Sequence, residues 1–188
     1  MSAWNLFRAR PAAAPAAALY AAIVARSRDT RFYLEGGVPD SLDGRFEMVA
    51  LHLYLALRRL RGAGPEAEAM GQALVDTLFA DMDANLREMG AGDLGVGRRV
   101  KRMASGFYGR VAAYEEGQAK GNVEAALRRN LFGTVTPPAA AVAAMNLYLA
   151  TAGAALAQQP LEEILAGRPN FGEPPFSAGG TQAPKEES

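Results

Sequence analysis

The chain has 188 residues, of which 49% are hydrophobic and 21% charged, a composition that fits one globular domain and excludes gross disorder. Its 20 basic and 20 acidic residues balance, so no whole-molecule field attracts nucleic acid, and we expect no DNA partner. The chain has no cysteine and one histidine, His52, which excludes disulfides, thiolate metal sites and two-histidine zinc sites within it. We therefore expect neither a metal nor a cofactor.

The N-terminal region predicts a flexible segment, residues 1–14, that leads into a first helix. An alanine-rich run over residues 12–25 follows two arginines, as in a targeting peptide. Pro15 interrupts this run, however, and its larger apolar residues stand at helical spacing. We interpret the run as a helix of the domain rather than as a targeting segment. We identify no apolar stretch of the roughly 18 to 20 residues that a membrane span needs.

A loop over residues 31–40 precedes a second helix, which we predict over residues 42–61 and which Asp40 or Ser41 caps. Its core stripe consists of Phe46, Val49, Ala50, Leu53, Leu57 and Leu60. Its other side is also partly apolar, with Met48, Leu51 and Leu55 among charged residues that include Arg58 and Arg59. The helix is therefore either central to a bundle, which is the favoured interpretation, or displays a binding stripe.

A third helix is predicted over residues 65–89, after the turn at Gly62 and Gly64. Its core stripe comprises Leu74, Val75, Leu78, Phe79, Met82, Leu86 and Met89. Acidic residues follow its two edges: Asp76 and Asp83 on one, Asp81 and Glu88 on the other. Residues seven positions apart lie roughly 10 Å apart along a helix, too far for one metal ion. We interpret these acids as a solvated edge, with recognition of a basic partner as the alternative.

The most strongly charged segment follows a predicted loop over residues 90–97. It contains Gly95, Gly97, Arg98, Arg99, Lys101 and Arg102. Free amides at a helix start, together with four cations, would suit a phosphate, a carboxylate or an acidic partner. Cations at that position oppose the helix dipole, so stability alone does not explain them. Both nucleotide-binding glycine fingerprints are missing from the segment. A binding site and a plain solvated face remain equal alternatives.

The fourth predicted helix has two contrasting faces. Its core stripe consists of Val100, Met103, Phe107, Val111 and Tyr114. Its opposite face has almost no side-chain bulk and consists of Ser105, Gly106, Gly109, Ala112 and Ala113. Because glycine inside a helix costs about 1 kcal/mol relative to alanine, this face predicts a helix-docking surface. The alanine-rich segment 138–159 of the same chain is the favoured occupant, and an external partner is the alternative.

Three further helices are predicted over residues 122–132, 138–159 and 161–166. Proline, glycine and polar residues dominate positions 168–188, which predicts a mobile tail. The sequence therefore predicts an all-α, single-domain bundle of about six helices. Its parts are a flexible N-terminus (1–14), a helical domain (15–166) and a disordered tail (167–188).

His52 is the residue with the most obvious catalytic chemistry. Its neighbours in the predicted packed helix are Leu51 and Leu53, and no nucleophile or orienting acid can be assigned to it from the sequence. We interpret His52 as a packed or interface histidine. We therefore predict no catalytic residue and no enzymatic activity.

Four ordered blocks resemble a known family. They are Val38-Pro-Asp-Ser-Leu-Asp-Gly-Arg-Phe-Glu47 running into Leu51-His-Leu-Tyr-Leu55, Leu78-Phe-Ala-Asp-Met-Asp83, Met89-Gly-Ala-Gly-Asp-Leu-Gly-Val-Gly-Arg-Arg-Val-Lys-Arg-Met103 and Phe107-Tyr-Gly-Arg110. Together they resemble the ubiquinol-cytochrome c chaperone family, and the likeness covers residues 19–134. The resemblance implies a helical, non-enzymatic assembly factor of the ubiquinol-cytochrome c reductase, respiratory complex III.

The resemblance also implies a membrane-protein client, cytochrome b, and leaves open whether a second assembly factor takes part. It favours a bacterial-type cytoplasmic protein, with peripheral contact at the inner membrane left open. For the client site we expect an exposed stripe of Met48, Leu51 and Leu55 beside Arg58 and Arg59, because methionine and leucine adapt to varied partners. The alternative function is a module that binds an anion, a phospholipid or RNA at residues 95–102.

Overall fold

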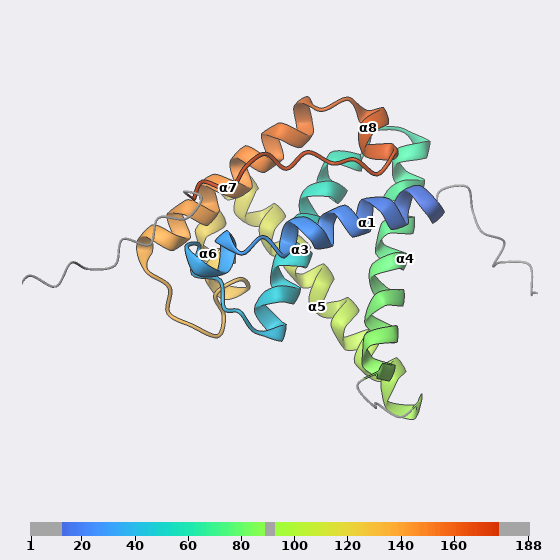
Figure 1. Cartoon of the computed structure of the whole chain (residues 1–188), viewed down its shortest axis with the longest axis horizontal. Helices are drawn as coiled ribbons and strands as arrows, with labels where there is room; N and C mark the ends of the chain where they lie inside the picture. The colour runs from blue at the N-terminus through green and yellow to red at the C-terminus, as the bar shows by residue number, and fades with distance from the viewer. Residues whose placement is uncertain (1–12, 89–92, 177–188) are drawn as a thin grey trace, which may run out of the picture.

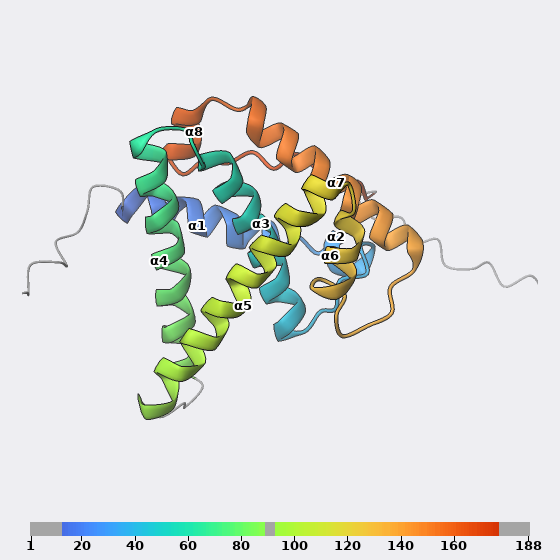
Figure 2. The ribbon, with the colours of Figure 1, turned by 180° about the vertical axis from the view of Figure 1, so that it is seen from behind.

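A computed structural model of the chain describes residues 13–88 and 93–176, and over these ranges it consists of eight helices without strands (Figures 1 and 2). The helices are α1 (Ala13–Ser27), α2 (Arg31–Leu34), α3 (Leu42–Leu60), α4 (Pro65–Glu88), α5 (Asp93–Lys120), α6 (Val123–Arg129), α7 (Ala139–Gln158) and α8 (Leu161–Leu165). The predicted all-α class is confirmed. The predicted flexible segment 1–14 lies outside the described residues except for its last two positions, which begin α1.

Helix α3 is the centre of the bundle. It packs against α1, α4, α5 and α7, and eleven of its residues are buried. A helix with neighbours on several sides must be apolar on several sides, which explains the apolar residues outside its first stripe. The central position favoured from the sequence is confirmed.

The start of α3 is fixed by a side-chain cap and by a close backbone approach. The Ser41 hydroxyl accepts a hydrogen bond from the Gly44 amide at 3.1 Å, as an N-cap serine does. Gly44 is buried, and a Cβ atom there would lie 2.0 Å from the Pro39 carbonyl oxygen. Glycine is therefore required where the loop before α3 crosses the first helical turn.

Helices α4 and α5 meet at one end of the molecule and diverge from there (Figures 1 and 2), and both pack against α3. The predicted loop over residues 90–97 is too long, because α5 begins at Asp93. Gly95 and Gly97 lie inside this helix, where glycine is tolerated at a modest cost. The structure does not describe four residues predicted to lie in the core: the side chains of Leu86, Val100 and Met103, and the whole of Met89.

The segment expected to be a loop before α3 contains a short helix, α2. Its buried residue, Phe32, contacts the rings of His52 and Tyr148 at centroid distances of 5.6 and 4.9 Å. Gly36 and Pro39 limit the helix to one turn but do not prevent it. One apolar ring anchors a segment whose composition is otherwise typical of a loop.

The predicted tail is partly wrong, because residues 168–176, here called the C-terminal strap, pack on the bundle. Phe171 is 3% exposed and contacts the His52 ring at 4.9 Å. Phe176 contacts Phe32 at 6.1 Å, and Glu173 pairs with Arg31 at 2.7 Å. Two aromatic side chains and one ion-pairing carboxylate thus connect a proline- and glycine-rich segment to the bundle. Residues 177–188 lie outside the description.

Helix α7 corrects the expectation that no segment is apolar enough to span a membrane. Its 20 residues meet the length and composition of a span. The helix packs against α3 and α6, and 39% of its most apolar window is buried in the bundle. A core helix of a folded domain has the same composition, so this property alone does not assign α7 to a membrane.

Candidate functional site

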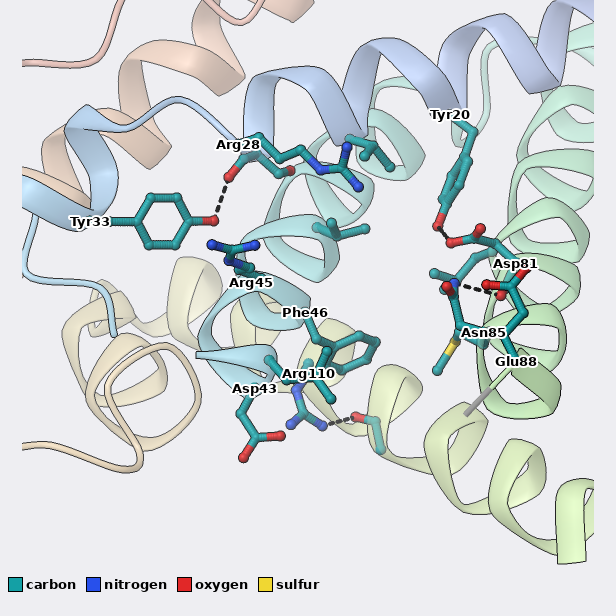
Figure 3. A pocket seen from close by; sticks show the side chains of 17 residues that line it. Tyr20, Arg28, Tyr33, Asp43, Arg45, Phe46, Asp81, Asn85, Glu88 and Arg110 are labelled. Atoms are coloured by element: carbon teal, nitrogen blue, oxygen red, sulfur yellow. Dashed lines mark hydrogen bonds between the residues drawn. The ribbon is translucent and has the colours of Figure 1, made fainter. Parts of the chain in front are cut away.

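A cleft of about 740 Å³ opens between α1, α3, α4 and α5, and we call it the α1–α4 cleft (Figure 3). Its lining includes Tyr20 and Val24 from α1, Arg28 directly after α1, Tyr33 from α2, Leu42, Asp43, Arg45, Phe46 and Val49 from α3, Leu78, Asp81, Met82, Asn85 and Glu88 from α4, and Gly106 and Arg110 from α5. Three of the four sequence blocks that carry the family resemblance contribute residues to this lining. The fold therefore gathers them around one cavity.

The floor of the cleft is apolar. Phe46 and Val49 from α3 are half-buried and lie opposite Leu78 and Met82 from α4, which are buried. At the edge of the cleft, Leu42 is 73% exposed. Leu42 therefore extends the apolar lining from the floor to the edge of the cleft.

An ion pair between Glu47 and Arg110 lies at the base of the cleft. The Arg110 Nε donates to both carboxylate oxygens at 2.7 Å, its Nη2 also donates to Glu47, and its Nη1 donates to the Gly106 carbonyl at 2.9 Å. Burial raises the pKa of Glu47, while Arg110 opposes this effect. The guanidinium also stacks over the Phe46 ring at 5.3 Å. The pair connects α3 to α5 and orients one side of the apolar floor.

The α4 wall of the cleft is acidic and polar. Asp81, Asn85 and Glu88 are exposed and occupy positions i, i+4 and i+7 on α4, so they share one face. The Tyr20 hydroxyl donates to Asp81 at 2.8 Å, which connects α1 to α4. The pKa of Tyr20 is raised, first by burial and then by its bond to Asp81.

The opposite wall, formed by the end of α1 and the start of α3, carries Arg28 and Arg45 (Figure 3). Arg45 pairs with Asp40 at 2.7 Å, and Asp43 lies beside Arg110 in the lining (Figure 3). The Tyr33 hydroxyl donates to the Ser27 carbonyl at 2.6 Å, which holds α2 against the end of α1. The cleft thus has an acidic wall, a mixed wall with two arginines, and an apolar floor.

His52 lies in the core, so its interpretation as a packed histidine is confirmed. Its Nδ1 lies 2.8 Å from the Met48 carbonyl oxygen and its Nε2 lies 2.7 Å from the Tyr148 hydroxyl. Since a carbonyl only accepts, Nδ1 carries the proton and Nε2 accepts from Tyr148. Complete burial lowers the pKa of His52 to about 4. The ring is neutral and fully hydrogen-bonded at physiological pH.

The described ranges 13–88 and 93–176 contain no group of three or more His, Asp or Glu side chains arranged to hold a metal ion. The acids of α4 illustrate the reason. Asp81 accepts from Tyr20 and Asp83 pairs with Arg87 at 2.7 Å, so successive acids point to different partners.

The exposed client stripe expected on α3 is wrong. Met48 and Leu51 are 0% exposed and Leu55 is 2% exposed, because α3 is surrounded by other helices. Arg59 donates to the Leu156 and Gln159 carbonyls at 2.9 and 3.2 Å, an arrangement that satisfies the C-terminal carbonyls of α7. Arg58 is exposed.

Arg58 and Arg59 line a second, separate groove of about 610 Å³ between α3, α5 and α7. Leu55 contributes to its wall, together with Gln118 and small residues of α7 such as Gly153. Three residues of the predicted client site, Leu55, Arg58 and Arg59, therefore line a cavity. This cavity is separate from the α1–α4 cleft, and the residues of α7 that line it have mostly small side chains.

The predicted anion site is changed by the earlier start of α5. Gly97 and the residues after it lie inside the helix, so their amides are engaged in the helical ladder and the expected free amides are not at that position. The side chains of Arg98, Arg99, Lys101 and Arg102, and the surroundings of Gly95, lie outside the described part, and their role stays a prediction.

The small-residue face of α5 is not covered by α7, contrary to the favoured expectation. Helix α7 packs on α3 and α6, which leaves Ser105, Gly109 and Ala112 exposed. A Cβ atom added at Gly109 would meet open space. Gly106 and Ala113 differ from these residues. A Cβ atom at Gly106 would lie 3.0 Å from Nη1 of Arg110, and Ala113 is buried in the core.

Sequence reasoning missed the residues that define the cleft, notably Tyr20, Glu47, Arg110 and the opposing arginines. The sequence pattern places Asp81 and Glu88 on one edge of the helix over residues 65–89. It places Phe46 and Val49 in the core stripe of the helix over residues 42–61. The missing information was the partner of each charged residue. Glu47 and Arg110 are 63 positions apart, and no local spacing connects them.

Residues 34–171 match the sequence profile of the family described as Ubiquinol-cytochrome C chaperone. The chain belongs to the ubiquinol-cytochrome C chaperone family. The match begins at residue 34 rather than at the predicted residue 19, and it extends beyond the predicted limit at residue 134 to include α7 and α8. The alanine-rich helix α7 is therefore part of the family's domain rather than an addition to it.

Solved and curated proteins agree with this membership. The crystal structure of the Cbp3 homolog from Brucella abortus superposes with a TM-score of 0.76 at 36% identity, covering 86% of this chain and 91% of that one. The ubiquinol-cytochrome-c reductase complex assembly factor 1 of Xenopus laevis is 26% identical over 115 residues, 60% of this chain. Its counterpart from Mus musculus is 25% identical over 99 residues, 53% of this chain.

The matched region spans 58% of the Xenopus protein and 34% of the mouse protein. This member of the ubiquinol-cytochrome C chaperone family therefore spans between about a third and three fifths of the length of these curated relatives.

Proposed function

We propose that this chain is a non-enzymatic assembly chaperone of the ubiquinol-cytochrome c reductase and that it binds a hydrophobic membrane-protein client, cytochrome b, in the α1–α4 cleft. The observation that carries the proposal is an open cleft with an apolar floor inside the domain that matches the family. The assembly-factor names of the vertebrate relatives support the target complex. A cytoplasmic protein that works at the inner membrane, with or without a second assembly factor, fits this role.

The cleft supports client binding because it combines apolar contact area with polar edges. The exposed Leu42 and the half-buried Phe46 and Val49 offer a surface that a newly made apolar segment can cover, whereas Leu78 and Met82 also line the cleft but are buried in this structure. The charged rim keeps the unoccupied cleft hydrated and limits self-association. A neutral, buried His52 and the paired Glu47 leave neither group poised for proton transfer, which favours binding over catalysis.

The test is client recovery from a bacterial host whose membrane contains ubiquinol-cytochrome c reductase. The tagged chain is crosslinked in cells and the captured proteins are identified by mass spectrometry. We expect cytochrome b in the wild-type sample and a loss of at least severalfold with Leu42→Asp. An acidic residue in the first turn of α3 suits the helix dipole, so this variant should fold.

The matched control is Leu34→Asp, because Leu34 is 82% exposed but does not line the cleft. Equal loss with both variants, or no reductase subunit in the wild-type sample, would contradict the proposal.

A further inference from the structure

We propose that the α1–α4 cleft recognises a helical apolar segment with Lys or Arg at one end, and that the acidic wall of α4 binds those cations. This inference rests on the proposed client-binding function and specifies the chemistry of the segment. Its basis is the asymmetry between the two walls of one cavity (Figure 3).

The first step concerns the secondary structure of the bound segment. All four walls of the cleft are helices, so the cavity offers no strand edge to which an extended peptide could add. A bound helix satisfies its own backbone hydrogen bonds and needs only apolar contact from the floor. A volume of about 740 Å³ suits the side chains of one helix face rather than a whole helix.

The second step concerns charge. The α4 wall presents Asp81 and Glu88, both exposed, with Asn85 between them, and a helical spacing of seven residues separates the two carboxylates by roughly 10 Å. Such a row can pair with cations spread over two turns of a bound helix. Of the three arginines in the lining, Arg110 pairs with Glu47, Arg45 pairs with Asp40, and Arg28 lies on the opposite wall (Figure 3), so the α4 wall keeps its acidic character.

The third step distinguishes a protein segment from a lipid. An anionic lipid headgroup would gain from Arg28 and Arg45 but would also meet Asp43, Asp81 and Glu88 in the same lining. A segment that is apolar and carries cations at one end only can place them against the α4 wall while its uncharged part lies towards Arg28 and the paired Arg45. Membrane proteins carry this pattern at the cytoplasmic ends of their spanning helices, where Lys and Arg are in excess.

The experiment uses fluorescein-labelled synthetic peptides of about 16 residues, roughly four helical turns. They share one apolar face and end in two Lys, two Gln or two Glu. Fluorescence anisotropy measures their affinity for the full chain. We expect the Lys peptide to bind roughly threefold to tenfold more tightly than the Glu peptide at low salt, and the difference to shrink as salt is raised.

The decisive variants change the α4 wall. Asp81→Lys with Glu88→Lys should invert the preference, so that the Glu peptide binds best. Since Asp81 also accepts the Tyr20 hydrogen bond, the milder pair Asp81→Asn with Glu88→Gln keeps an acceptor there and should remove the preference without inverting it. The control is Glu66→Lys with Asp76→Lys, which changes the same net charge at exposed positions of α4 outside the cleft.

A peptide preference that the wall variants leave unchanged would overturn the inference, even if cytochrome b is recovered from cells. A clear preference that follows the wall charges would uphold it, even if the captured client is another membrane protein. Phosphatidylglycerol vesicles, added as competitors of the Lys peptide, test whether an anionic lipid occupies the cleft instead. If they displace the Lys peptide through Arg28 and Arg45, the occupant is a lipid and the inference is wrong.

Discussion

Glu47 of α3 and Arg110 of α5 form an ion pair at the base of the cleft, and the carboxylate accepts from two guanidinium nitrogens while its side chain is 7% exposed. Removing one partner of such a pair strands a buried charge, whereas removing both does not. We expect Arg110→Ala to lower the free energy of unfolding by roughly 2–4 kcal/mol. The double variant Glu47→Leu with Arg110→Leu should recover part of that loss. Urea unfolding of both proteins checks this, and equal stability of the two would contradict it.

The pH dependence of stability should reveal Glu47 separately. Burial raises its pKa above the ordinary value in the folded state, so the folded protein binds this proton more tightly than the unfolded chain. Glu47 therefore contributes stability that is fully present below its ordinary pKa. This stability is lost as the pH rises through the pKa that Glu47 has in the folded protein. Glu47→Gln should therefore flatten the stability curve in this acidic range. A wild-type minus variant curve that rises with pH would contradict the assignment.

His52 should act in the opposite direction. Its pKa falls to about 4 in the folded state from an ordinary value of 6.5, so the unfolded chain takes up this proton first. Stability should fall as pH decreases between these two values, by up to about 1.4 kcal/mol per pH unit. In His52→Gln this component should disappear. Asp29 and Asp40, whose pKa values are lowered, contribute equally to both proteins and cancel in the difference.

The C-terminal strap can be tested by comparing two chain lengths. A chain that ends at residue 176 keeps Phe171, which is 3% exposed, and a chain that ends at residue 170 loses it. We expect the shorter chain to be less stable by roughly 2–4 kcal/mol, the cost of removing a buried aromatic side chain. Phe171→Ala in the full chain should have a similar effect. Equal melting temperatures for the two lengths would show that the strap does not support the core.

Two helical glycines should respond to alanine in opposite ways. Gly44→Ala places a methyl group against the Pro39 carbonyl oxygen, so we expect a loss of roughly 1–3 kcal/mol. Gly109→Ala meets open space and should stabilise the protein by about 0.5–1 kcal/mol through helix propensity. Thermal unfolding compares them. A destabilised Gly109→Ala would mean that the exposed face of α5 is covered in solution.

Helix positions could be predicted because glycine, proline and caps mark their ends locally. Ser41 and Gly62 bound α3 as expected, since each acts within one turn. The start of α5 could not be predicted in this way, because Gly95 and Gly97 are tolerated inside a helix once its later turns pack on α3 and α4. The ordered strap was missed for a related reason: its order depends on rings of α2 and α3.

The candidate site was harder to predict than the fold. Met48, Leu51 and Leu55 looked like a binding stripe because their own helix has another apolar face, and only the positions of α1, α5 and α7 around it decide that they are buried. The cleft combines α1, α3, α4 and α5. Its opening depends on how far these helices diverge, a property that hydrophobic periodicity does not encode.

The composition of α7 has a consequence for synthesis in the cell. Its twenty residues carry no charge, so α7 exposes a large apolar surface to water until it packs on the bundle. Its partners α3 and α6 precede it in the chain and emerge first. A delay in the folding of the N-terminal helices would therefore leave the apolar surface of α7 without the helices that cover it in the folded protein.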